Sequence, residues 1–114
     1  KPIQPKSVNN ARDDKLRTSG FWRKSFDERR CLIPARSFCE AKGHNPSPYV
    51  RFGVTGDEER PAFALAGVWR SYKGNSGGGD LREMVTSSMV TTTPNALVED
   101  SHPDRMPMIL APED

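Results

Sequence analysis

Hydrophobic and polar residues alternate in short runs along this chain, a pattern that predicts strands more than helices. The longest apolar run, from Ala62 to Trp69, is nearly continuous, as expected of a strand buried on both faces. Residues 49–54 alternate apolar and other side chains, which is typical of a half-buried strand, and residues 84–92 have a β-type composition. We therefore expect residues 62–69 to form the central strand of the core.

Shorter apolar runs predict further elements on either side of this strand. Residues 21–26 favour a short helical turn with an aromatic face, and residues 38–41 favour a short strand. Residues 30–34 indicate a strand that ends at Pro34, because proline has no N–H to donate to a neighbouring strand. The remaining expected elements are an extended or loop segment up to Asp14, a flexible loop over residues 73–80 and a final strand over residues 106–110.

One further helix is expected near the C-terminal end. Thr93 offers a hydroxyl for the N-cap and Pro94 fits the first helical position, so a short helix should run to about Asp100. With this helix included, the elements predict an α+β, mainly β fold of short antiparallel strands and a few short helices, without a βαβ repeat.

The composition fits one small, turn-rich domain. The chain has 114 residues, of which ten are proline, nine are glycine and only 34% are hydrophobic, which argues against a helical bundle. No apolar run is long enough to cross a bilayer, and the first residues do not resemble a signal peptide. We expect a cytoplasmic monomer, associated with the nucleoid if the source is bacterial, that has no membrane partner.

The charges are unevenly distributed along the sequence, although the net charge is only +2. Residues 1–36 hold ten Lys and Arg against four acids, a balance of +6, whereas residues 37–114 hold seven against eleven, a balance of −4. The basic half could contact phosphates, or it could form a solvated face in a charge-balanced fold, because segregation in sequence does not require segregation in space. Both interpretations stay open at this point.

The two cysteines predict no disulfide framework and no metal centre. Cys31 and Cys39 lie in apolar settings and lack the paired Cys or His ligands of a zinc site. We expect both to be reduced and to pack as small core hydrophobes, and we expect neither a metal nor another cofactor.

Four segments form an ordered set of motifs along the chain. They are Asn-Ala-Arg at 10–12, Arg-Cys-Leu-Ile-Pro-Ala at 30–35, Phe-Cys-Glu at 38–40 and His-Pro-Asp-Arg-Met-Pro at 102–107. Together with supporting blocks at residues 48–49, 63–69 and 91–95, they resemble the SRAP (SOS response-associated peptidase) family over nearly the whole chain.

The resemblance implies a pseudo-barrel fold that binds single-stranded DNA containing abasic sites, in the DNA damage (SOS) response. In the family, an N-terminal cysteine attacks the abasic aldehyde through its amine and closes a thiazolidine crosslink with its thiol; the family is also classed with peptidases. This sequence begins with Lys1 in place of the family's Met-Cys-Gly-Arg start. We therefore expect residues 1–114 to form one partial SRAP domain that does not crosslink DNA by itself.

The resemblance assigns catalytic roles to three residues. Glu40 matches the family glutamate that relays protons, and its place at the end of a short apolar run suits a partly buried general acid or base. His102 matches the histidine that protonates the sugar ring oxygen, although two residues separate it from Arg-Met-Pro where the family often has one. Asn10 matches the asparagine that orients the amine and the lesion. Without the resemblance, each of the three is an ordinary surface or turn residue.

Four residues are expected to bind DNA. Arg12 and Arg105 match family phosphate contacts, for which a guanidinium fork is well suited, and Thr91 could donate a hydroxyl to a phosphate. Trp22 could stack on an exposed base, whereas Trp69 is expected to pack in the core because it ends the long apolar run.

Three functions remain open after the sequence alone. The first is an enzyme that crosslinks abasic sites, and the second is a crosslink-incompetent module that only binds single-stranded DNA. The third is a cysteine-type peptidase that pairs Cys39 or Cys31 with His102 and Glu40, for which the sequence supplies no evident oxyanion hole.

Overall fold

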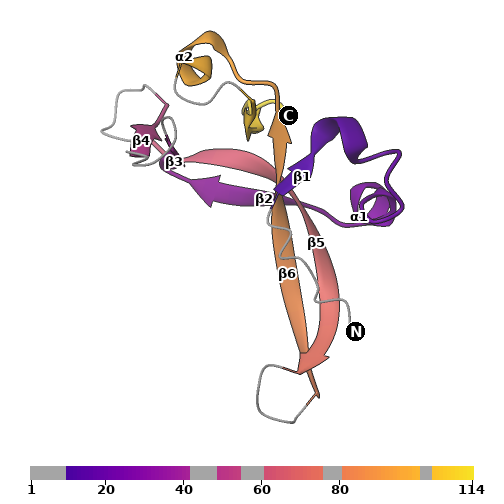
Figure 1. Ribbon diagram of the computed structural model, residues 1–114. Helices are drawn as coiled ribbons and strands as arrows, with labels where there is room; N and C mark the ends of the chain where they lie inside the picture. The colour runs from indigo at the N-terminus through magenta and orange to yellow at the C-terminus, as the bar shows by residue number, and fades with distance from the viewer. Residues whose placement is uncertain (1–9, 42–48, 55–60, 76–80, 101–103) are drawn as a thin grey trace.

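The computed structural model describes residues 10–41, 49–54, 61–75, 81–100 and 104–114. Within these ranges the longest strands are β5 (Phe63–Asn75) and β6 (Leu81–Thr92), which pair antiparallel in a six-stranded sheet (Figure 1). The sheet curls into a half-barrel, and short helices accompany it, so the predicted mainly β, pseudo-barrel class is confirmed. The expected central strand is β5, which continues beyond Trp69 to Asn75.

Two strands complete the sides of the long hairpin. β1 (Asn10–Arg12) pairs parallel with β6, and β2 (Arg30–Ala35) pairs antiparallel with β5, in the order β1-β6-β5-β2. The expectation that β2 ends at Pro34 is wrong, since the strand continues to Ala35. β2 lies at the end of this strand order, and the edge of a sheet is where proline is tolerated within a strand.

The expected final strand is two short strands. β7 (Met106–Pro107) pairs with β6, and β8 (Ile109–Leu110) pairs with β5. Met108 lies between them, where its N–H donates to the Val90 carbonyl and its own carbonyl accepts from the Ala66 N–H, both at 2.9 Å. The backbone of Met108 thus hydrogen-bonds to both β6 and β5, at the point where the C-terminal segment passes from one strand to the other.

A smaller sheet consists of β3 (Phe38–Ala41) and β4 (Tyr49–Phe52), which pair antiparallel. The bounds of β3 agree with the prediction, whereas β4 is two residues shorter than the alternating segment from which it was predicted. Phe38 and Phe52 face each other across the pair with their rings stacked 5.3 Å apart.

The described helices are short. They are η1 (Asp13–Lys15), α1 (Arg23–Glu28) and α2 (Ala96–Glu99). The predicted cap of α2 is wrong, because the N-cap is Asn95 and not Thr93: the Asn95 side-chain oxygen accepts a hydrogen bond from the Val98 N–H at 3.0 Å. Asparagine ranks among the best N-cap residues, so it takes the cap two positions later.

The flexible loop expected over residues 73–80 is wrong for its first three residues. Residues 73–75 belong to β5, where Lys73 lies opposite Glu83 of β6. Opposite charges on paired strands favour continued pairing. Residues 76–80 lie outside the described residues.

The core is divided between two hydrophobic clusters. The first joins the main sheet to η1 and α1, with Trp22, Phe26, Ala66 and Met108 packed around its buried centre, and the second joins the small sheet to α2 and β7, with Phe38 and Val50 at its margin. The buried centres are Ala11, Leu16, Val68 and Val90 in the first cluster, and Phe52, Val98 and Met106 in the second.

Two side chains, those of Cys39 and Trp69, are more exposed than expected. Cys31 is half-buried but Cys39 is exposed, so the expectation of a core thiol is wrong for Cys39. Phe38 and Glu40 in β3 are half-buried, and successive residues of a strand point to opposite faces, so Cys39 between them points outward. Trp69 is also exposed, at 36%, because Val68 takes the core-facing position beside it.

Candidate functional site

The end of the main sheet brings together residues that lie far apart in the sequence. β1 pairs with β6 so that Asn10 lies beside Met89 and Arg12 beside Thr91. Ala11 between them is fully buried in the first cluster, so Asn10 and Arg12 project from the opposite, exposed face. The parallel pairing therefore places two predicted site residues next to a third, Thr91.

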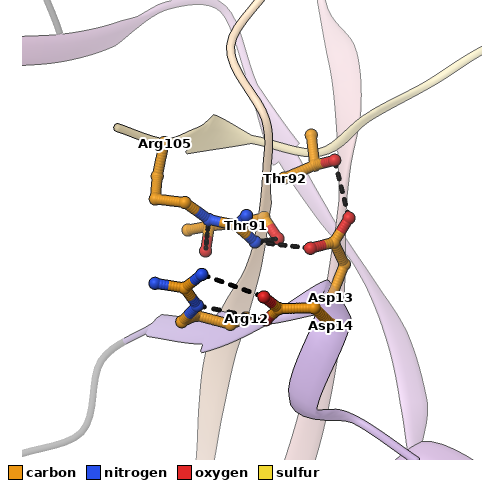
Figure 2. A network of polar contacts seen from close by, with 6 residues as sticks. All are labelled: Arg12, Asp13, Asp14, Thr91, Thr92 and Arg105. Carbon is orange, nitrogen blue, oxygen red and sulfur yellow. Dashed lines mark hydrogen bonds and ion pairs between the residues drawn. The ribbon is translucent and has the colours of Figure 1, made fainter. Parts of the chain in front are cut away.

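Arg105 is fixed by several contacts at this point (Figure 2). Its Nη2 donates to a carboxylate oxygen of Asp13 and, at 2.6 Å, to the Thr91 carbonyl, while its Nε lies 3.4 Å from Thr91 Oγ1. The hydroxyl of Thr92 donates to the second Asp13 oxygen at 2.7 Å. The arginine side chain is only 16% exposed, so these contacts hold a largely buried cation in one orientation.

Arg12 makes a separate, exposed ion pair. Its Nε and Nη2 donate to the two carboxylate oxygens of Asp14 at 3.1 and 2.9 Å, the parallel geometry that a guanidinium fork favours. Both side chains are about half exposed, 54% for Arg12 and 50% for Asp14. The pair faces solvent, so the arginine can exchange this carboxylate for another anion.

The two carboxylates of η1 are both held in their charged form. Burial raises the pKa of Asp13, but the hydrogen bonds from Arg105 and Thr92, with the charge of Arg105, together lower that pKa below its ordinary value. The hydrogen bond from Arg12 lowers the pKa of Asp14 and raises that of Arg12. Sequence reasoning missed both aspartates, although their position directly after Arg12 was a signal that they could pair with it.

Glu40 lies in β3 of the small sheet, near the second cluster. It is far from both Arg12 and Arg105 in the sequence. It is half-buried in β3 and lies opposite Val50 of β4, on the same face of β3 as Phe38. Phe38 and Val50 both pack against that cluster. The carboxyl group therefore occupies the margin of an apolar surface, as the sequence predicted.

His102 lies outside the described residues, so its position relative to Glu40 is not described. The described chain stops at residue 100 and resumes at residue 104, and on these two sides Val98 in α2 and Met106 in β7 are both buried in the second cluster.

The remaining candidates lie elsewhere. Trp22 packs against the first cluster, with its ring edge-on to Phe21 at 4.6 Å between centroids. Cys39 and Glu40, adjacent in β3, point to opposite faces of the small sheet, which separates the thiol and carboxyl of the peptidase hypothesis. Among the described residues, no cluster of His, Cys, Asp and Glu could hold a metal ion, and no helix is long and apolar enough to span a membrane.

Comparison with known proteins defines the class to which this fold belongs. The family model described as SOS response associated peptidase (SRAP) matches residues 1–114, and the chain belongs to that family.

Particular relatives extend the comparison. The chain is 36% identical over 107 residues to the abasic site processing proteins YoqW and YobE of Bacillus subtilis (strain 168). A crystal structure of a Bacteroides thetaiotaomicron protein matches 91% of the chain with a TM-score of 0.70 and 26% identity. The match covers 91% of this chain but only 44% of YoqW, 45% of YobE and 44% of the solved chain, so it spans less than half the length of each relative.

Proposed function

We propose that this chain binds single-stranded DNA at abasic sites and supplies both a backbone-binding surface and a proton-transferring carboxylate for their processing. Membership of the SRAP family and the names of the Bacillus relatives support an abasic-site substrate. The observation that carries the proposal is the convergence of Asn10, Arg12, Thr91 and Arg105 at one end of the main sheet.

The two arginines have different roles in this proposal. Arg12 is exposed and is held by one neighbouring carboxylate, so a DNA phosphate can take the place of Asp14 in the same two-point geometry. Arg105 is bound on several sides and acts mainly by fixing the Thr91 segment and adding positive potential. Contacts of this kind position a strand without reading its bases.

The chemistry that we propose needs a proton donor near the lesion aldehyde. An amine nitrogen adds to the aldehyde carbon, loss of water gives an imine, and a thiol sulfur then adds to the imine carbon while its proton passes to nitrogen. Glu40, half-buried beside apolar side chains, donates the proton that leaves with the hydroxyl as water. In this scheme His102 protonates the sugar ring oxygen and Asn10 orients the amine.

The amine and thiol of this reaction must belong to the same N-terminal cysteine, and neither Cys31 nor Cys39 can provide both groups. We therefore expect noncovalent binding by the 114-residue polypeptide. In a longer family polypeptide that contains these residues behind an N-terminal cysteine, Glu40→Gln should slow crosslink formation and leave DNA affinity nearly unchanged.

Fluorescence anisotropy with a labelled oligonucleotide carrying one abasic site tests the binding, and a denaturing gel tests for a covalent adduct. The expected result is salt-sensitive binding without a heat-stable shifted band. Absence of binding at low salt would refute the proposed function. A heat-stable band from the 114-residue chain would refute the assignment of the nucleophile to an N-terminal cysteine.

A further inference from the structure

Trp69 presents an aromatic ring to solvent on the same sheet face as the candidate DNA contacts. It lies in β5 opposite Ser87 of β6, and residues 87, 89 and 91 of β6 share one face because side chains alternate along a strand. Asn10 and Arg12 lie beside residues 89 and 91 on that face. Positions 87 and 91 are about 13 Å apart along β6. One short oligonucleotide can therefore contact both Trp69, opposite position 87, and Arg12, beside position 91.

Two hollows meet at Trp69. One is apolar and is lined by Cys31, Ile33 and Val85, of which Val85 is 70% exposed. This hollow offers a surface that the flat, weakly polar face of a nucleobase can cover.

The second hollow is cationic and is also lined by Trp69, together with Phe21, Lys24, Arg29 and Arg70. Arg29 is held in place, because its Nε donates to the Trp69 carbonyl at 3.0 Å and its Nη2 donates to Ser25 Oγ at 2.7 Å. Two carboxylates lie nearby: Glu83 accepts a hydrogen bond from Ser71 at the margin, and an oxygen of Glu28 lies 3.9 Å from Arg29 Nη1, so the three cations outnumber the two acids. This hollow suits a phosphate.

We propose that Trp69 is a base-stacking platform for single-stranded DNA, with the adjacent cationic hollow taking a neighbouring phosphate. This inference rests on the proposed function and extends its binding surface along β6 and β5 from Arg12. An indole beside an arginine-lined and lysine-lined hollow matches the two parts of a nucleotide, a stacking base and an anionic phosphate. Stacking is independent of base identity, because every base has a π-face, so this platform gives affinity without sequence specificity.

Substitution of Trp69 tests the inference by anisotropy with a fluorescein-labelled oligothymidine carrying one abasic site. Trp69→Ala should weaken binding about 5- to 100-fold, the range expected for loss of one stacked base. Trp69→Phe should recover most of the affinity. The slope of log affinity against log salt should be the same in all three proteins, because an uncharged ring releases no counterions.

Tyr72 provides the matched control. It is 50% exposed on the same strand but lines neither hollow, and its position three residues further along turns it to the face opposite to Trp69. Tyr72→Ala should leave the affinity unchanged, and DNA should quench the tryptophan emission of the wild type far more than that of Trp69→Phe. Circular dichroism of each variant should match the wild type.

The outcomes separate this inference from the proposed function. If the wild type binds DNA and Arg12→Ala weakens it while Trp69→Ala does not, the stacking platform is refuted and the proposed function stands. Equal losses in Trp69→Ala and Tyr72→Ala would also refute the platform, because they would indicate a nonspecific effect of removing surface aromatics. If the wild type does not bind, both proposals fail.

Discussion

The two ends of the candidate site are built in opposite ways. At the end of the main sheet, Arg12 and Arg105 are each neutralised by an aspartate of η1, so charge is balanced within a polar network. At the small sheet, Glu40 lies on a face made mainly of apolar residues. Under the proposed function, the first arrangement keeps Arg12 in place for exchange with phosphate, whereas the second holds a half-buried acid beside apolar side chains for proton transfer.

The two regions are joined through adjacent residues of one segment. Arg105 contacts Asp13 and Thr91, while the next residue, Met106, is buried in the second cluster. Consecutive side chains in an extended segment point in opposite directions, so a few residues fix both regions relative to each other. Substitutions here should separate the contributions of the two regions.

The largest expected effect on stability comes from substitution of Met106, which is only 6% exposed. Met106→Ala should lower the free energy of unfolding by about 2–5 kcal/mol, because it removes buried contacts and leaves a cavity. Urea denaturation measures the change. Met106→Leu, which nearly conserves volume, should cost less than about 1.5 kcal/mol and keeps the comparison possible if the alanine variant does not fold.

The control for this substitution is Leu97→Ala in α2. Leu97 is 69% exposed, so its removal should change the unfolding free energy by no more than about 0.5 kcal/mol. Equal losses at Met106 and Leu97 would contradict the assignment of Met106 to the connection between the two regions.

A smaller loss is expected at Asp13. Asp13→Asn should destabilise the protein by about 1–2 kcal/mol at neutral pH, since it removes the negative charge that Asp13 places beside the largely buried Arg105. The folded-state pKa of Asp13 is lower than its ordinary value of 3.8, so its contribution is present above that value and is lost as the pH falls through the folded pKa. Urea titrations from neutral pH to below pH 3.8 should therefore show the wild type and Asp13→Asn converging in stability. A constant difference would contradict the ion-pair account.

The smallest effect on stability is expected at the exposed pair of Arg12 and Asp14. Asp14→Asn should leave the urea midpoint unchanged, because exposed ion pairs contribute little to stability. The same substitution should strengthen DNA binding by a few fold, since it removes a carboxylate that competes with phosphate for Arg12. Unchanged or weakened affinity would argue that Asp14 holds Arg12 in its binding geometry.

Much of the fold could be predicted from local patterns, because alternation and apolar runs report directly on strands such as β3 and β5. Local patterns failed where pairing decided the outcome. The continuation of β2 past Pro34 depends on its place at the end of the strand order, and the extension of β5 beyond Lys73 depends on pairing with β6. Neither is encoded within a window of a few residues.

The candidate site was predictable in part. Motif order placed Asn10, Arg12 and Arg105 among the candidates, but the partners Asp13 and Asp14 emerged only when η1 was seen beside β6. Trp69 was expected in the core because its run is apolar, yet alternation within β5 gives the buried position to Val68. A continuous apolar run does not show which of its residues remain at a surface.

The salt dependence of DNA affinity is a direct test of the proposed phosphate contact at Arg12. Binding of abasic single-stranded DNA should be measured between about 50 and 200 mM salt for the wild type, Arg12→Ala and Glu40→Gln. The slope should fall by about 0.7 in Arg12→Ala, which corresponds to one phosphate contact on a single strand, and Glu40→Gln should keep both the slope and the affinity of the wild type. Equal slopes in all three proteins would contradict the phosphate contact at Arg12.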